Sequence, residues 1–467
     1  MGMITALFDN STYSLEEAFR ATDCTSELMR NAIREWFDLY FDSEATKEED
    51  PCMRMAYTVV NKLVKTAFGE YSTTTDDDFA SEMLDKLNDR RKAAVQKALI
   101  GGVAYLRPIP MYAGKHYTLH IAVVSRNNVM IFGKDVDGNP TDIGMVEHTF
   151  EQRWHYTLLE RRTVGPDGRL TIRYMLYRAH DAGMLGEMVP LGTLPKYEGL
   201  VPEYTFPRPL SAPLGMVSVR TPITNCVDGS EDPVSVYAPA VGLIHNININ
   251  EAQINGEFDR GKSRIIASDD LLSKDKNGRS RFDETLFVGL DEDPDKIGVT
   301  IFSPSLREQS YLARKQDYLR AIETVIGLKR GLISEVEAAE RTATEITSSA
   351  GDYNLTIIDF QEMWETALKA AVKLCGELGV LYKVPGAHEI TDDDKVTVDW
   401  GNGILYDEDK TWADYKDMVA SGLIKPEIAL GWRFGMPTDT PEDLAAIREK
   451  YMPGVKDMTE DVDDADE

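Results

Sequence analysis

The sequence lacks the segments that would place it in or across a membrane. In its 467 residues, no apolar run approaches the length of about eighteen that a membrane-spanning helix needs. Residues 1–19 contain neither the basic segment nor the apolar core of a secretory signal, and the opening Met-Gly-Met does not continue as a myristoylation signal. We therefore expect a protein that is made in the cytosol and has no membrane partner.

Cysteine and histidine are scarce, and neither is clustered. The 4 cysteines form no C-x-x-C pair, and the 7 histidines are dispersed. A zinc site needs thiolates or imidazoles at short spacings, so no metal site is predicted. His116 and His120 lie in an extended segment, where their spacing does not make the metal-binding pair of a helix. We expect reduced thiols, no metal and no cofactor.

The chain has far fewer basic than acidic residues. The chain has 51 Lys and Arg residues against 79 Asp and Glu residues, which gives a formal net charge of −28. A protein that holds DNA by neutralising phosphates is normally basic, because its affinity comes from Lys and Arg that release counterions. Either DNA is irrelevant to this protein, or DNA passes near it without binding tightly. An acidic surface that only maintains solubility is the simpler interpretation, and composition does not decide between them.

The first hundred residues have the pattern of helices. An apolar stripe over residues 83–99 has helical spacing, and Asp78 is placed to cap its beginning. Gly101 and Gly102 are placed to stop this helix.

Strand-like sequence follows. Residues 103–106 begin an extended stretch that we expect Pro108 and Pro110 to end. Between about Tyr117 and Arg220 the apolar period changes to two, and Val, Ile, Tyr and Thr are frequent. Turn signals of the Asp-Gly type separate these runs. The pattern predicts an antiparallel meander.

The segment after the strands is ambiguous. Residues 236–262 alternate like a strand around Ile247 and Ile249, but their apolar residues fit one face of a helix equally well. Residues 264–302 have the pattern of a small β unit. Periodicity does not decide whether residues 236–262 form a helix or a strand.

Two further helices are predicted. Ser303 and Ser305 each begin a capping signal for the first of them, and glycine-containing residues 327–331 interrupt it. A second periodic stretch, over residues 342–378, would be about 55 Å long as a helix. A helix of this length suggests packing against other long helices or against copies of itself.

The C-terminal region has shorter elements. Residues 395–400 and 403–405 have the pattern of a strand pair, and two or three short helices follow. The acidic residues 456–467 are too charged to pack, and we expect them to be disordered.

One motif suggests an enzyme. Residues 256–263 match G-x-x-x-x-G-K-S, the phosphate-binding loop, and an acidic pair follows an apolar run some residues later. However, Glu257 and Asp259 within the loop would repel a phosphate, and residues 264–267 have the pattern of a strand where a helix should begin. The two motifs are also too close together for a doubly wound sheet. No other catalytic pattern stands out, so we expect no enzymatic activity.

The order of the elements from residue 236 onward is distinctive. Residues 305–368 contain a helix, a short break and a long helix that opens with Thr-Ala-Thr-Glu at residues 342–345. This order resembles the portal proteins of long-tailed double-stranded DNA bacteriophages. Residues 54–61, 101–105 and 156–161 also resemble positions of that family, so the resemblance extends over most of the chain.

The resemblance implies an α+β subunit built as a portal protein: an α/β wing, a two-helix stem, a small β-containing clip, a long helix and a helical crown. The implied segments are the wing of helices and then antiparallel strands (1–235), the first stem helix (236–262), the clip (263–303), the second stem helix (304–328), the tunnel loop (329–341), the long wing helix (342–384), the C-terminal strands and crown helices (385–455) and a disordered acidic tail (456–467).

The resemblance also implies an assembly and its partners. About twelve copies would form a ring at one vertex of the capsid, assembled in the host cytoplasm and retained in the virion. Double-stranded DNA would be packaged and ejected through this ring. The ring would bind the terminase motor, scaffold and capsid proteins, and later the head–tail connector.

Charged residues of two segments are the implied contact sites. The tunnel loop would place six of them nearest the DNA: Lys329, Arg330, Glu335, Glu337, Glu340 and Arg341. The clip would present four to its partners: Lys274, Lys276, Arg279 and Arg281. The basic loop residues would make brief phosphate contacts, while an acidic wall would let DNA slide. Ordinary solvated charges at helix ends are the alternative interpretation.

Two other functions stay open. A nucleotide-hydrolysing enzyme would turn over ATP or be stabilised by nucleotide against heat. Another ring or adaptor component of a phage head would share the oligomeric state but lack the two stem helices and the clip.

Overall fold

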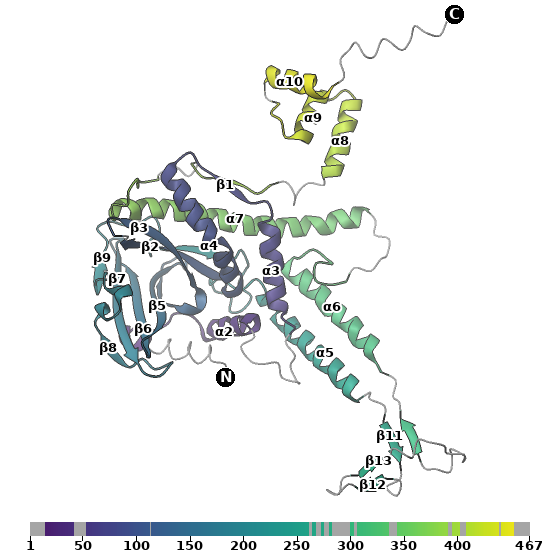
Figure 1. Ribbon diagram of the computed structural model, residues 1–467, viewed down its shortest axis with the longest axis horizontal. Coiled ribbons are helices and arrows are strands. Elements are labelled where there is room, and N and C mark those ends of the chain that lie inside the picture. Colours follow the sequence, from purple (N-terminus) through teal and green to yellow (C-terminus); the bar gives the residue numbers. More distant parts are fainter. Residues whose placement is uncertain are drawn as a thin grey trace, which may run out of the picture. The chain divides into compact units, whose positions relative to one another are not determined.

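The computed structural model describes most of the chain (Figure 1). The described residues are 15–41, 53–112, 114–260, 264–267, 272–274, 280–282, 299–302, 306–335, 343–390, 395–401, 408–438 and 440–452. The chain divides into two compact units, one of Met1–Gly69 with Thr73–Val398 and one of Glu70–Ser72 with Asp399–Glu467. Helices and antiparallel strands occupy separate stretches of the chain, which agrees with the predicted α+β class.

The described N-terminal part is helical, as predicted: residues 15–19 are helical, and α2 (Glu27–Phe41), α3 (Met55–Ala67) and α4 (Asp78–Gly101) follow. The expected cap of α4 was wrong by one residue. Asp77 has the extended backbone of an N-cap, and its carboxylate accepts a hydrogen bond from the backbone N–H of Ala80 at 2.9 Å, whereas Asp78 is already helical. A short strand, β1 (Ser72–Thr74), pairs with β15 (Thr397–Asp399).

A three-stranded sheet follows α4, in the order β10 (Val217–Arg220), β2 (Val103–Tyr112) and β3 (Tyr117–Ser125). The prediction that two prolines end the first strand was wrong. Pro108 and Pro110 lie within β2, opposite Ile121 and Leu119 of β3. The sheet tolerates them because β10 pairs with β2 only as far as Leu106, so the missing N–H groups disturb no second neighbour.

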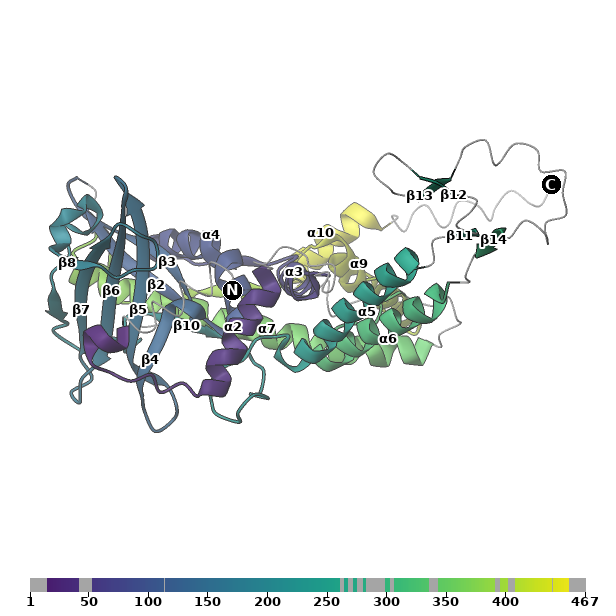
Figure 2. The ribbon, with the colours of Figure 1, turned by 90° about the horizontal axis from the view of Figure 1, so that it is seen from below.

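The larger sheet is a meander, visible in Figure 2. Its strands are β4 (Val129–Lys134), β5 (Pro140–Glu151), β6 (Trp154–Val164), β7 (Leu170–Ala179) and β8 (Glu187–Val189), with β9 (Glu203–Thr205) also paired to β7. The predicted meander is therefore confirmed from β4 to β8. β9 pairs back to β7, and β3 and β10, at the two ends of the predicted range, belong to the other sheet. The short helical turn η1 (Arg126–Asn128) lies between β3 and β4, and its buried Arg126 donates hydrogen bonds to Thr25 and to the carbonyl of Val129.

The two sheets share one apolar core. It contains residues from β2, β4 and β5 and from the chain just before β10: Val103, Tyr105, Val129, Ile131, Ile143, Met145, Leu214 and Met216. A buried ionic group joins the sheets as well, since Glu160 of β6 accepts from Arg107 of β2 at 2.8 Å and from Arg162 at 2.6 Å.

The ambiguous segment is a helix. α5 (Val241–Arg260) buries Ile244, Ile247 and Ile254, which lie on one side at helical spacing. The first residues of the phosphate-loop match, 256–260, are therefore the last turn of a helix, and the strand β11 (Arg264–Ala267) comes soon after. A phosphate-binding loop has the reverse arrangement, in which the loop opens a helix.

A second helix, α6 (Glu308–Ile326), packs antiparallel to α5 (Figure 2). Lys315 forms an ion pair with Glu251 at 2.9 Å, and Arg307 forms one with Glu257 at 3.0 Å. The capping signals at Ser303 and Ser305 do not begin this helix, because its first residue is Glu308 and Arg307 precedes it without a side-chain cap. Short strands lie between the two helices in the chain: β11 pairs with β14 (Val299–Phe302), and β12 (Leu272–Lys274) pairs with β13 (Ser280–Phe282).

The long helix is confirmed as α7 (Ala343–Leu381). Ile357, Trp364 and Leu368 are buried on its side that faces α3, α4 and the three-stranded sheet. The second unit contains α8 (Glu408–Ala420), α9 (Pro426–Phe434) and α10 (Pro441–Tyr451), in agreement with the predicted short helices. The expected strand at 403–405 and the acidic tail at 456–467 lie outside the described residues, and the finer division into eight segments stays a prediction.

The turn from α4 into β2 generates a stability prediction. Gly102 has a φ of 82°, and a Cβ there would lie 2.2 Å from the backbone oxygen of Pro233. Gly229 has a similar φ of 70° but open space around it. Gly102→Ala should therefore lower the free energy of unfolding by about 3 kcal/mol or more, and Gly229→Ala by only about 1 kcal/mol. Urea denaturation of both variants checks this, and equal losses would contradict it.

Candidate functional site: the basic turn between α6 and α7

Helix α6 ends at a glycine that the neighbouring helix requires. Gly327 has the left-handed conformation, with a φ of 76°, and its N–H closes the helix by bonding to the carbonyls of Glu323 and Thr324. A Cβ at this position would lie 2.6 Å from the hydroxyl oxygen of Thr356 on α7. The end of α6 therefore lies close against α7.

A tight turn carries the two basic residues of the predicted tunnel loop. The N–H of Leu332 donates to the carbonyl of Lys329 at 3.1 Å, which closes a turn over residues 329–332. Gly331, the third residue, has a φ of 87°, as a type II turn requires. Lys329 and Arg330 are both exposed in this turn. Their charges are therefore available to an anion.

A buried carboxylate organises the loop. Glu323 is 1% exposed, and its carboxylate accepts four hydrogen bonds from residues 331–334. The donors are the backbone N–H of Gly331 (3.1 Å), of Ile333 (2.6 Å) and of Ser334 (2.9 Å), and the hydroxyl of Ser334 (2.7 Å). Within the described residues, this carboxylate has no ion-pair partner. Backbone dipoles offset its charge instead.

The end of the loop is held by α6 as well. The backbone N–H of Glu335 donates to the side-chain oxygen of Gln316 at 2.9 Å, while the Glu335 side chain is exposed. Of the six predicted loop residues, the structure thus brings Lys329, Arg330 and Glu335 onto one short, well-bonded segment. Glu337, Glu340 and Arg341 lie outside the described residues. Sequence reasoning missed Glu323, because a glutamate inside an amphipathic helix resembles any solvated charge.

The predicted clip residues are only partly described. Lys274 is in β12 opposite Ser280, and Arg281 is in β13 opposite Ser273, so the two basic residues occupy adjacent register positions of one strand pair. Lys276 and Arg279 lie outside the described residues. The role of all four in an interface stays a prediction.

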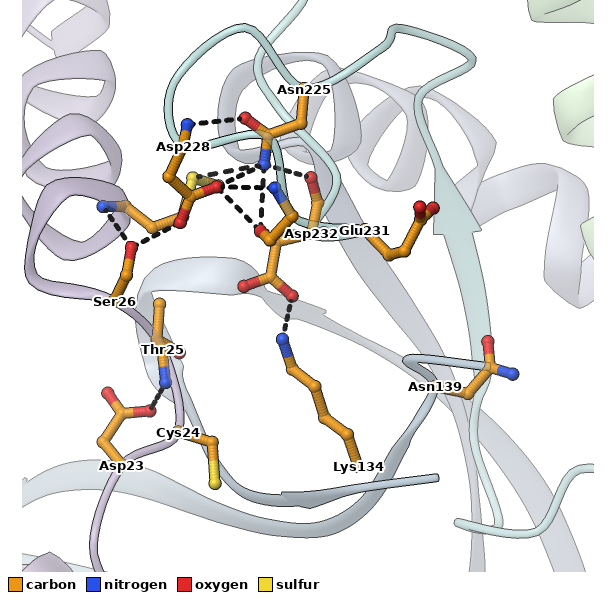
Figure 3. A network of polar contacts seen from close by, with 12 residues as sticks. Asp23, Cys24, Thr25, Ser26, Lys134, Asn139, Asn225, Asp228, Glu231 and Asp232 are labelled. Atoms are coloured by element: carbon orange, nitrogen blue, oxygen red, sulfur yellow. Dashed lines mark hydrogen bonds and ion pairs between the residues drawn. The ribbon is translucent and has the colours of Figure 1, made fainter. Parts of the chain in front are cut away.

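A polar network fastens the segment that leads from β10 to α5 (Figure 3). The side-chain amide of Asn225 donates to the carboxylate of Asp228 at 2.9 Å and to the carbonyl of Asp232 at 3.1 Å. The hydroxyl of Ser26, at the start of α2, donates to Asp228, and Lys134 of β4 pairs with buried Asp232 at 2.5 Å. The Asp-Gly turn signal at residues 228–229 marks this loop in the sequence, but its partners come from distant parts of the chain.

The same segment is tied to the end of α4. The N–H of Val236 bonds to the carbonyl of Leu99 at 2.9 Å, and the buried hydroxyl of Tyr237 donates to the carbonyl of Trp36 at 2.7 Å. The first turn of α5 therefore follows directly on a rigidly bonded anchor. This anchor holds the α5–α6 pair against the N-terminal helices.

No group of three or more His, Cys, Asp and Glu side chains among the described residues is placed to hold a metal ion. None of the described helices combines the length and the apolar character needed to cross a membrane.

Comparisons with known proteins give a distant structural likeness. No protein-family model and no curated protein matches the chain. Among solved structures, the chain is similar to one from the neck of a native GTA particle computed with C12 symmetry, with a TM-score of 0.46, 11% identity, and coverage of 92% of this chain and 99% of that chain. A chain from the neck of an empty GTA particle computed with C6 symmetry gives a TM-score of 0.46 and 12% identity, covering 87% and 93%. Similarity at this level does not assign the chain to a family.

The polar network around Asn225 and Asp228 predicts how the stability of the fold depends on pH. Burial by itself would raise the pKa of Asp228, but hydrogen bonds from Ser26 and Ser230 outweigh it and hold the pKa below its usual range. A lowered pKa means that the carboxylate stabilises the fold above about pH 4, its unfolded pKa, and that this contribution is lost as the pH falls further. Asp228→Asn should therefore cost about 1 kcal/mol at pH 7 and progressively less below pH 4.

The control for this prediction is Glu231→Gln, which removes the same charge from an exposed neighbour. Denaturant unfolding at a series of pH values measures both variants. A loss for Asp228→Asn that does not change with pH would contradict the role assigned to the carboxylate.

Proposed function

We propose that the chain is the portal protein of a tailed phage or of a phage-like particle, and that it acts as a channel subunit without catalysis. The observation that carries the proposal is the antiparallel pair of α5 and α6, separated in the chain by short paired strands and followed by the long helix α7. In this reading α5 and α6 are the stem, β11 to β14 belong to the clip, and the turn at residues 329–332 belongs to the tunnel loop. The two sheets with α2, α3, α4 and α7 are the wing, and α8 to α10 are the crown.

Exposed apolar side chains on the stem support assembly with other copies. Ile249 and Phe258 of α5 are 50% and 47% exposed, and Leu312 and Val325 of α6 are 50% and 47% exposed. Burying a large apolar side chain contributes about 1.5–3 kcal/mol, so a subunit in water gains by covering them. The proposed occupant is a neighbouring copy, in a ring of about twelve.

The charge of the chain suits a channel that DNA must leave as well as enter. A net charge of −28 disfavours tight binding of DNA by the chain as a whole, while Lys329 and Arg330 are exposed in the turn between α6 and α7. Contacts to phosphate would thus be few and weak, which allows sliding. The proposed partners are double-stranded DNA, terminase, scaffold and capsid proteins and the head–tail connector, in a virion at the portal vertex.

Assembly through the stem is a testable prediction. Ile249→Glu combined with Leu312→Glu should convert rings of about twelve subunits into monomers, because unpaired charges would have to be buried at each interface. Native mass spectrometry and class averages of single particles measure the oligomer. Met188→Glu, which changes a 68% exposed residue of β8, is the matched control and should leave rings intact. Rings from the stem variant would contradict the proposed interface, and a wild-type chain that never forms rings would contradict the proposed function.

DNA contact by the basic turn is tested separately. Lys329→Glu with Arg330→Glu should leave the ring mass unchanged but weaken binding of a linear DNA duplex at low salt by about tenfold or more, because phosphate contacts are lost. Lys62→Glu with Lys65→Glu, on exposed positions of α3, makes the same change in charge and should have a smaller effect. Fluorescence anisotropy over a range of salt concentrations measures both. Loss of assembly would instead make the turn residues structural.

A further inference from the structure

We propose that Glu323 is a positioning residue, which holds Lys329 and Arg330 in the orientation that phosphate contact requires. The proposal rests on the proposed function, since it assumes that the turn meets DNA. It deepens that function by assigning the shape of the turn to a residue that is itself buried and cannot touch DNA.

One residue holds both sides of the basic pair. The N–H of Leu328, just before Lys329, donates to the backbone carbonyl of Glu323 at 2.8 Å. The N–H of Gly331, just after Arg330, donates to the Glu323 carboxylate at 3.1 Å. The residues on both sides of Lys329 and Arg330 are therefore bonded to the same residue of α6.

Glu323 differs from the other buried carboxylates of the described chain. Glu160 pairs with Arg107 and Arg162, Asp232 pairs with Lys134, and Glu427 pairs with Arg448. Glu323 takes only backbone N–H groups and one hydroxyl. It thus shapes a turn that carries two cations without neutralising either of them.

The hydrogen bonds require a carboxylate. One oxygen accepts from the N–H groups of Ile333 and Ser334, and the other accepts from the N–H of Gly331 and the hydroxyl of Ser334. A glutamine has one accepting oxygen and one donating amide, so it would set a donor against at least one backbone N–H. The loop would then lose its single conformation, and the ordering cost would be added to each phosphate contact.

The direction in which DNA affinity changes in Glu323→Gln distinguishes a positioning role from a purely electrostatic one. Glu323→Gln removes one negative charge, and on charge alone the ring should bind DNA more tightly. Loss of positioning predicts weaker binding. Glu335→Gln removes the same charge from an exposed side chain of the same loop and leaves the four hydrogen bonds in place. It is therefore the matched control.

The experiment compares assembled rings of the wild type, Glu323→Gln and Glu335→Gln. Hydrogen–deuterium exchange of residues 328–335 reports the loop, and anisotropy of a fluorescent DNA duplex at several salt concentrations reports phosphate contact. Glu323→Gln should speed exchange by about tenfold to a hundredfold and weaken DNA binding several-fold, with a shallower salt dependence. Glu335→Gln should keep slow exchange and bind DNA equally or more tightly.

Three outcomes are decisive. Unchanged exchange in Glu323→Gln overturns the proposal, and so does fast exchange with DNA binding as tight as that of Glu335→Gln. If Glu323→Gln does not assemble, Ser334→Ala makes the same test by removing one of the four hydrogen bonds, and wild-type exchange and binding in that variant overturn the proposal. Failure of the proposed function looks different: the charge reversal at Lys329 and Arg330 then leaves DNA binding unchanged, even if Glu323→Gln loosens the loop.

Discussion

The shape of the α6–α7 loop depends on one buried carboxylate that has only main-chain and hydroxyl partners. Glu323 is fully withdrawn from water, and four donors from residues 331–334 converge on it. A buried carboxylate without donors costs several kcal/mol, so the loop and the carboxylate stabilise one another. The basic turn depends on this contact, because the exposed Lys329 and Arg330 lie between Leu328 and Gly331, which both bond to Glu323.

A second constraint lies at the same end of the helix pair, just before the start of α5. The segment before α5 is bonded to α2 through Ser26 and to β4 through Lys134, and its last residues bond to the end of α4. The ion pairs between α5 and α6 then hold the second helix to the first. The helix pair is thus anchored to the sheets at its base, while its outer sides carry uncovered apolar groups. Under the proposed function, a firmly anchored helix pair with uncovered apolar side chains is what a subunit of a symmetric ring needs.

Local patterns predicted the regular elements wherever neighbours along the chain decide the outcome. The stripe at residues 83–99 became α4 and the stripe at residues 342–378 became α7, since each needs only one apolar side to be covered. The prediction was wrong where pairing with a neighbouring strand determines how far a strand extends. Pro108 and Pro110 look like strand breakers, yet β2 continues through them because its second neighbour has already ended. The choice between helix and strand for α5 could not be made from period alone, because both patterns were present.

The sequence by itself determined the acidic charge, the order of the helices and strands apart from α5, and the candidate loop with its two cations. It also contained the reasons against a phosphate-binding loop at residues 256–263, whose first residues prove to be the end of a helix. Only the tertiary structure decided which acid is buried, which loop residues converge on it and which apolar side chains stay uncovered. Hydrogen bonds of this kind join atoms whose approach depends on the turn at Gly331 and on the packing of α7 against Gly327, and neither property is carried by the residue types alone.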